Sequence, residues 1–217
     1  MKTLYPVIFL IFVCTLCTSV VSSYTDATHY SKVFGHEKTY RIYLPADYEQ
    51  SEKQYPVVYY FHGWGGRHNI GGRSNIDYDA LVGFANKYQT ILVLWDGRIE
   101  EDEPRPYNVG NHNDVKYTVQ MKDYFIELLE HIDETYRTLP NRENRGIVGF
   151  SMGGFMSFYL AGKYHDKVSA AVNIVGSQEF FIGYPDNHTL YPLAYTFDNL
   201  RDVNLMFLNR TQCPMSG

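Results

Sequence analysis

The stretch RGIVGFSMGGF, residues 145–155, carries the pattern Gly-x-Ser-x-Gly centred on Ser151. The apolar residues 146–150 before the serine predict a strand, and residues 152–164 after it predict a helix. A serine at such a junction lies on a tight turn, so the residues two positions before and two positions after it must be small. The turn lifts the hydroxyl above the sheet and points a helix N-terminus at the developing negative charge. Glycine and serine also meet in ordinary turns, but this setting predicts that Ser151 is a nucleophile.

Apolar runs and helical patterns alternate along the rest of the chain. The predicted strands cover residues 39–44, 56–61, 90–95, 146–150, 169–175 and 203–208. The predicted helices cover residues 76–88, residues 152–164 and the stretch that begins at Asp114 and reaches Tyr136. Strands that alternate with helices favour a mostly parallel central sheet with helices on both faces. The predicted fold class is therefore α/β, in a single domain, which suits a chain of 217 residues.

The composition of the chain argues against some partners. The net charge is −5, the pI is near 5.9, and no basic patch or stripe stands out. A nucleic acid partner is therefore not expected. Aromatic residues make up 16% of the chain, which would suit a sugar-binding cleft, but aromatic residues also suit buried strands. The second explanation is the favoured one.

The N-terminus has the pattern of a secretory signal. Lys2 precedes an apolar run at residues 4–13, and small and polar residues follow that run. This order predicts a signal peptide at residues 1–23 and a mature domain at residues 24–217 that is secreted or periplasmic. The alternative, a membrane anchor, is disfavoured because the apolar run is short for a span. After removal of the signal, no stable membrane association is expected. Cys213 is then the one cysteine left, so no disulfide framework is expected.

A glycine-rich turn follows the strand predicted at residues 56–61. Its sequence is His62-Gly63-Trp64-Gly65-Gly66. Such a turn can supply one N–H group of an oxyanion hole, and the residue after the nucleophile supplies the other. The two amides expected here are those of Trp64 and Met152. The alternative is a turn that only changes the direction of the chain. His62 is expected to lie beneath the turn and support it rather than act as a base.

Four stretches together resemble the putative-esterase family. They are YPVVYYFHGWGG at residues 55–66, LVLWDGR at 92–98, DYFIELLEHIDETYRT at 123–138 and NRENRGIVGFSMGGFMSFYLAGKYHDKVSAAVNIVG at 141–176. That family includes esterase D, feruloyl and acetyl-xylan esterases, and mycolyltransferases. The resemblance implies an α/β-hydrolase fold, a serine acyl-enzyme mechanism, and no metal or organic cofactor. By position it implies Ser151 as the nucleophile and the amides of Met152 and Trp64 as oxyanion donors.

The resemblance also implies an acid and a histidine that follow the serine, each on a loop after a later strand. The acid is expected soon after residues 203–208. The sequence, however, holds no acid after Asp202 and no histidine after His188. The last strand and the last helix of the fold are therefore expected to be missing.

Residues between the last two predicted strands could complete the triad instead. Glu179 or Asp186 could orient His188, in the chain order serine, acid, histidine. Both partners would then come from one crossover loop, which leaves little freedom to place them. The alternative is a surface loop whose polar residues are solvated.

Two functions of different classes follow from these patterns. The first is a secreted serine carboxyl-ester hydrolase that acts on acyl esters of polysaccharides or on related small esters. The second is a catalytically silent esterase-like domain that only binds acyl or glycan ligands. Export disfavours glutathione thioesters as substrates. With the last strand missing, the apolar edge at residues 203–208 is expected to be unprotected and to favour self-association.

Overall fold

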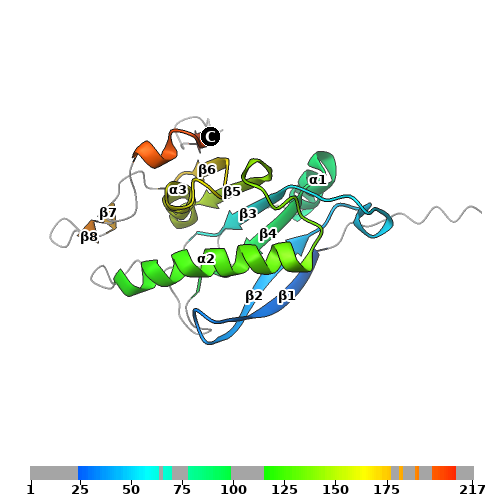
Figure 1. The fold of residues 1–217 in the computed structure, drawn as a ribbon, viewed down its shortest axis with the longest axis horizontal. Helices are drawn as coiled ribbons and strands as arrows, with labels where there is room; N and C mark the ends of the chain where they lie inside the picture. The colour runs from blue at the N-terminus through cyan, green and yellow to red at the C-terminus, as the bar shows by residue number, and fades with distance from the viewer. Residues whose placement is uncertain are drawn as a thin grey trace, which may run out of the picture.

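The fold of the chain was determined as a computed structural model (Figure 1). The structure describes residues 24–63, 66–69, 78–98, 115–176, 181–182, 189–190 and 197–208. Within these ranges seven strands form one sheet, in the order β1-β2-β4-β3-β5-β6-β9. The strands are β1 (Tyr24–Ser31), β2 (His36–Tyr43), β3 (Val57–Phe61), β4 (Ile91–Trp95), β5 (Arg145–Phe150), β6 (Ala170–Ile174) and β9 (Asn204–Leu208).

Three α-helices accompany the sheet within the described ranges. They are α1 (Tyr78–Tyr88), α2 (Val115–Thr135) and α3 (Met152–Lys163). Short 3-10 helices span Tyr48–Gln50, Arg142–Asn144 and Phe197–Leu200, and the two-residue strands β7 (Phe181–Ile182) and β8 (Thr189–Leu190) pair with each other. In the part of the chain that the structure describes, no helix has both the length and the apolar character needed to cross a bilayer.

The sheet is mostly parallel, as the sequence predicts. β3 pairs in parallel with β4 and β5, and β6 pairs in parallel with β5 and β9. β1 and β2 form an antiparallel hairpin, and β2 joins β4 in antiparallel orientation. The carboxyl ends of β3, β4, β5 and β6 therefore lie along one edge of the sheet. In open α/β sheets this is the edge at which ligands bind.

Helices cover both faces of the sheet, which confirms the predicted layers. Successive strand residues point to opposite faces, and the buried apolar side chains form two clusters. In the first cluster, Phe61 and Trp95 pack with side chains of α2 and α3, and their ring centroids lie 4.2 Å apart. In the second, Tyr60 and Leu92 pack with side chains of α1. Figure 1 shows α2 running across the sheet. The aromatic residues of these strands thus serve the core.

The N-terminal hairpin contains β1, the one strand of this sheet that the sequence did not predict. β1 has the polar sequence YTDATHYS, and β2 begins at His36, before the predicted start at residue 39. Asp26 and Arg41 are direct cross-strand partners, and Asp26 accepts two hydrogen bonds from Arg41, at 2.6 and 2.8 Å. The Arg41 guanidinium also lies 3.8 Å from the centroid of the Tyr24 ring. Charged and aromatic cross-strand pairs therefore stabilise a strand that lacks an alternating apolar pattern.

A buried histidine lies between this hairpin and α2. His29 of β1 is 7% exposed, and its ring stacks on those of Tyr124 and His131, with centroids 5.7 and 4.7 Å away. Burial, reinforced by the charge of His131, lowers the pKa of His29 to about 4. Burial also lowers the pKa of His131. The folded protein therefore keeps the His29 ring neutral at pH values where an unfolded chain binds a proton.

We expect the free energy of unfolding to fall as the pH drops from about 6.5, the pKa of a free histidine, towards the His29 pKa of about 4. In that window the unfolded state takes up a proton that the folded state does not, so His29 contributes a slope of up to about 1.4 kcal/mol per pH unit. Urea unfolding at several pH values measures the slope. The variant His29→Phe keeps a stacked ring and is expected to flatten the curve; an unchanged slope contradicts the assignment.

Candidate active site

Ser151 lies where β5 ends and α3 begins. Its backbone has a φ of 54° and a ψ of −114°, a conformation that costs a non-glycine residue about 1–3 kcal/mol. Two hydrogen bonds hold this conformation: the Ser151 N–H donates to the carbonyl of Ile174 at 2.8 Å, and the Phe155 N–H donates to the carbonyl of Ser151 at 3.2 Å. A strained turn between a strand and a helix is the setting in which a nucleophilic hydroxyl stands clear of the sheet.

The glycines around Ser151 are required by backbone contacts. A Cβ atom on Gly149 would lie 1.9 Å from the carbonyl oxygen of Gly153, and a Cβ atom on Gly153 would lie 2.0 Å from that of Phe61. A Cβ atom on Gly154 would lie 2.3 Å from Oδ1 of Asn173. The first turn of α3 therefore packs directly on the backbone at the ends of β3 and β5, and on the Asn173 side chain of β6.

The glycine-rich turn after β3 lies beside Ser151. A Cβ atom on Gly63 would come within 3.2 Å of both the Phe150 carbonyl oxygen and the Ser151 Cβ. The Gly66 N–H donates to the Gly63 carbonyl at 3.1 Å and closes a four-residue turn, whose two middle residues lie outside the described part of the chain. Met152, the residue after Ser151, is the first residue of α3. The N–H groups of a first helical turn have no intrahelical acceptor, so the Met152 amide can serve a ligand.

His62 supports this turn and is not a base. Its side chain is 1% exposed, and both ring nitrogens face backbone groups. The Gly97 N–H donates to Nε2 at 2.9 Å, so Nε2 carries no proton, and Nδ1 donates to the Gly63 carbonyl at 2.9 Å. Burial lowers the pKa of His62 to about 4, so the ring is neutral at neutral pH. This arrangement agrees with the supporting role that the sequence predicts for His62.

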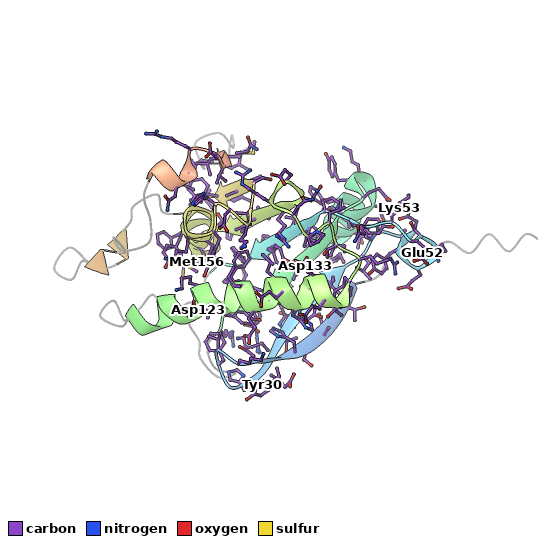
Figure 2. All side chains as sticks on the ribbon, viewed as in Figure 1. Tyr30, Glu52, Lys53, Asp123, Asp133 and Met156 are labelled. Carbon is purple, nitrogen blue, oxygen red and sulfur yellow. The ribbon has the colours of Figure 1, made fainter. Side chains whose placement is uncertain are left out.

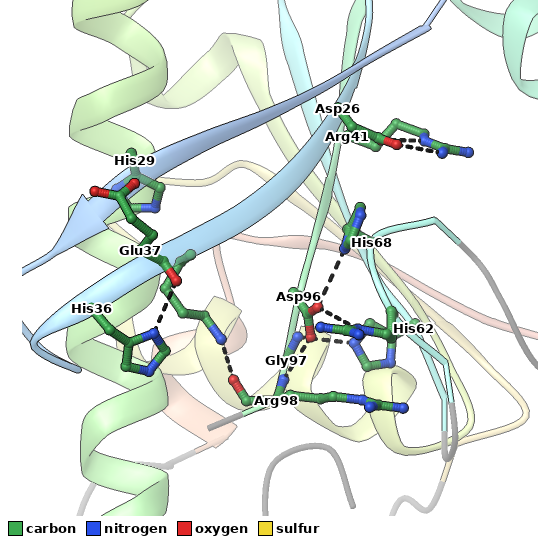
Figure 3. Close-up of polar contacts among 12 residues, drawn as sticks. Asp26, His29, His36, Glu37, Arg41, His62, His68, Asp96, Gly97 and Arg98 are labelled. Carbon is green, nitrogen blue, oxygen red and sulfur yellow. Dashed lines mark hydrogen bonds and ion pairs between the residues drawn. The ribbon is translucent and has the colours of Figure 1, made fainter. Parts of the chain in front are cut away.

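A buried carboxylate follows β4 at the same edge of the sheet (Figure 3). Asp96 is 2% exposed, and its Oδ2 lies 2.9 Å from Nε of Arg67 and 3.2 Å from Nδ1 of His68. The Arg98 N–H donates to Oδ1 at 3.0 Å. Burial alone would raise the pKa of Asp96, but the hydrogen bond with His68, the charge of Lys38 and the bonds from Arg98 and Arg67 outweigh it and hold the pKa well below the usual range. The sequence analysis assigned Asp96 no role beyond its place in the stretch LVLWDGR.

The chain leaves β6 next to Ser151. Val175 has a φ of 47°, an outlier for a β-branched residue, and its N–H donates to the Leu208 carbonyl at 2.8 Å. A Cβ atom on Gly176, the next residue, would lie 2.5 Å from the carbonyl oxygen of Ser151. The segment that follows Gly176 in the sequence therefore starts at the edge where Ser151 lies.

The remaining predicted site residues fall outside the described ranges. These predicted site residues are Trp64, Glu179, Asp186 and His188. Within the described part of the chain, no side chain hydrogen-bonds the Ser151 hydroxyl, and no three His, Cys, Asp or Glu side chains are grouped as metal ligands could be. The structure thus brings Ser151, Met152 and the flanks of the glycine-rich turn together.

This combination of sheet, strained serine and glycine-rich turn defines an α/β-hydrolase fold. The family model described as "Putative esterase" matches residues 31–190, so the chain belongs to that esterase family. The CE1 ferulic acid esterase of Anaeromyces mucronatus superposes with a TM-score of 0.61 at 24% identity, over 76% of this chain and 62% of that one. That likeness supports the fold.

Two curated relatives match over a similar stretch. Esterase Rv1288 of Mycobacterium tuberculosis is 30% identical over 132 residues, which cover 60% of this chain and 27% of that protein. The endo-1,4-beta-xylanase/feruloyl esterase of Xylanibacter ruminicola is 27% identical over 138 residues, which cover 59% of this chain and 18% of that protein. The matched stretch therefore amounts to about a quarter or less of these curated relatives.

We expect Gly153→Ala to destabilise the fold by about 3 kcal/mol or more, because its Cβ would lie 2.0 Å from a backbone oxygen that cannot move away cheaply. Gly83→Ala is the matched control. A Cβ at Gly83, within α1, meets nothing within 4 Å, so this change is expected to stabilise the protein by up to about 1 kcal/mol. Urea unfolding measures both. A Gly153→Ala variant as stable as the wild type contradicts the packing described for the turn at Ser151.

Proposed function

We propose that the chain is a serine carboxyl-ester hydrolase that works through an acyl-enzyme on Ser151. The observation that carries the proposal is the strained backbone of Ser151, with a φ of 54°, beside the turn that begins at Gly63. Backbone strain in a non-glycine residue persists where the surroundings enforce it, and such residues cluster at active sites. Membership of the esterase family supports the same assignment.

The proposed reaction starts with the Ser151 hydroxyl. Its oxygen attacks the acyl carbon of the ester while a base takes the hydroxyl proton. The carbonyl oxygen becomes an oxyanion, which accepts hydrogen bonds from the N–H groups of Met152 and Trp64. The C–O bond to the alcohol then breaks, and the alcohol leaves with the proton held by the base. Water repeats the sequence on the acyl-enzyme and releases the acid.

His188 is the proposed base, oriented by Glu179 or Asp186. Apart from His188, the one histidine after Ser151 in the sequence is His165. His165 follows α3, whose 12 residues extend about 18 Å from the Ser151 end. That distance rules out a direct hydrogen bond with Ser151. The segment with His188 begins instead at Gly176, beside Ser151.

The proposed substrates are acyl esters of polysaccharides or related small esters, met outside the cytoplasm. Two similar proteins, a xylanase/feruloyl esterase and a ferulic acid esterase, support this class by the activities in their names. The signal-like residues 1–23 support a secreted or periplasmic location. Under this proposal, methyl ferulate is a better substrate than a glutathione thioester.

The alternative function is a catalytically silent domain that binds acyl or glycan ligands. Under this alternative the hydroxyl of Ser151, for which the described residues provide no hydrogen-bond partner, stays unactivated. A serine without a positioned base has too small an alkoxide population for fast attack. Loss of triad members still leaves about 10³–10⁴-fold catalysis over water from the oxyanion hole and binding.

We expect Ser151 to be labelled by a fluorophosphonate probe. Hydrolysis of p-nitrophenyl acetate is expected to disappear in Ser151→Ala and to fall in His188→Ala to the residual rate that the oxyanion hole and binding supply. Ser169→Ala is the control, because the Ser169 hydroxyl bonds to the Glu143 and Arg145 carbonyls at the other end of β5. Labelling located by mass spectrometry and initial rates test both. Labelling that persists in Ser151→Ala contradicts the nucleophile, and a fast rate abolished by His188→Ala establishes the crossover-loop triad.

The proposal extends to self-association through β9. Among the described strands β9 borders the sheet, and Leu205, Met206 and Leu208 are 45%, 54% and 37% exposed. An apolar edge with unpaired backbone groups is a template for another strand. A two-fold axis beside β9 would pair the strand with its own copy in antiparallel orientation.

We expect a dimer at tens of micromolar, and a monomer when Met206→Lys places a charge on the β9 edge. Tyr30→Lys is the matched control: Tyr30 is 59% exposed on β1, at the opposite edge of the sheet, and this variant is expected to stay dimeric (Figure 2). Sedimentation velocity distinguishes the states. A folded wild-type monomer at these concentrations contradicts the proposal.

A further inference from the structure

The two flanks of the glycine-rich turn are held by one dipeptide, Asp96–Gly97. The turn segment is defined here as residues 62–68. On its N-terminal side, Nε2 of His62 accepts from the Gly97 N–H at 2.9 Å. On its C-terminal side, Arg67 and His68 both contact Oδ2 of Asp96, at 2.9 and 3.2 Å. Figure 3 shows Asp96 and Gly97 lying beside His62 and His68.

The turn segment needs such support because its own residues provide little rigidity. Gly63, Gly65 and Gly66 are three of the four residues that follow His62, and glycine has the widest choice of backbone conformations. A Cβ atom on Gly66 would lie 2.9 Å from the Cβ of His62, so the His62 side chain packs directly under the turn. The described flanks of the turn therefore depend on the His62 side chain and on what holds it.

Asp96 is suited to this task because both of its oxygens are engaged in a buried position. Its side chain is 3% exposed, Oδ1 accepts from the Arg98 N–H, and Oδ2 faces Arg67 and His68. Lys38, which is 4% exposed, adds a positive charge nearby and donates from Nζ to the Arg98 carbonyl. A buried carboxylate is costly unless it is paired, and removing its charge leaves its cationic partners uncompensated.

We propose that Asp96 is a positioning residue that fixes the oxyanion turn by holding Arg67 and His68 through its Oδ2 atom. This inference rests on the proposed function of Ser151. An oxyanion donor must lie about 2.7–3.1 Å from the oxygen that becomes charged, so small displacements of the turn matter. Asp96 itself touches no reacting atom. Its loss therefore lowers kcat, which depends on the oxyanion, more than it changes KM.

The test compares Asp96→Asn with Asp133→Asn. Asp133 (Figure 2) pairs with Arg145 at the start of β5, whereas Ser151 follows the end of that strand. The Asp133 side chain is 16% exposed and the Arg145 side chain is 6% exposed. Asp133→Asn thus removes a similar buried ion pair at the amino end of β5, the end of the strand away from Ser151. Three quantities are measured for each variant: kcat and KM for p-nitrophenyl acetate, the urea midpoint, and amide hydrogen exchange of peptides that cover residues 62–68.

We expect Asp96→Asn to lower kcat by about tenfold or more, less than the roughly 10²–10³-fold cost of losing an oxyanion donor outright. KM should change by less than about threefold, and exchange in residues 62–68 should become faster under native conditions. Asp133→Asn should lower the urea midpoint and leave kcat within about twofold of the wild type. Unchanged exchange in residues 62–68, or a kcat loss no larger than that of Asp133→Asn, overturns the proposal.

A second pair of variants decides the matter if Asp96→Asn does not fold. Arg67→Gln removes one donor to Asp96 from a side chain that is 26% exposed, and Arg67→Lys restores the charge. We expect Arg67→Gln to exchange amide hydrogens faster in residues 62–68 and to have a lower kcat, and we expect Arg67→Lys to restore both values. If both variants behave like the wild type, the proposal is overturned. If the wild type hydrolyses no ester, the proposed function fails, and the exchange measurements alone still test whether Asp96 holds the turn.

Discussion

The direct contact between the first turn of α3 and the ends of β3 and β5 is the constraint on which the site depends. Gly149 and Gly153 leave no room for a Cβ atom, because each would meet a backbone oxygen within 2.0 Å. With those two glycines the helix starts immediately after the strand, and Ser151 is forced into a backbone conformation with a φ of 54°. The same contact brings Gly63, in the turn that follows the neighbouring strand β3, close to Ser151. One steric requirement thus sets the place of the helix, the serine and the turn.

The buried polar side chains at the two ends of the parallel strands differ in their charge and in their hydrogen-bond partners. At the edge with Ser151, His62 is neutral and uses both ring nitrogens on backbone groups, while Asp96 is ionised and accepts on both oxygens. At the opposite end of β5, the Asp133–Arg145 pair ties α2 to the sheet. The buried charges are thus paired at both ends, which meets the condition for keeping ions in a low-dielectric interior.

The parts that the sequence predicts well are those with a local or periodic signal. Gly149 and Gly153 predict the turn at Ser151 because the turn has no room for a Cβ atom at either position. Runs of branched and aromatic residues predict the apolar strands between residues 56 and 208. β1 was missed because its stability comes from pairs such as Asp26 with Arg41, which are 15 residues apart. Asp96 was missed as a support because its partners Arg67 and His68 are 29 and 28 positions away in the chain. A single carboxylate at a strand end gives no pattern from which those contacts could be inferred.

The same geometry limits where a base for Ser151 can come from. The hydroxyl lies at the carboxyl edge of a parallel sheet, so a partner must reach it from a segment that leaves a strand at that edge. β3 and β4 already use their exits for His62 and for Asp96, and both side chains are committed to holding the turn. β6 is the next strand in the sheet, and Gly176 lies against the Ser151 carbonyl where that strand ends. The sequence after Gly176 contains Glu179, Asp186 and His188. The exit of β6 is therefore the shortest route by which this chain could bring a histidine to its serine.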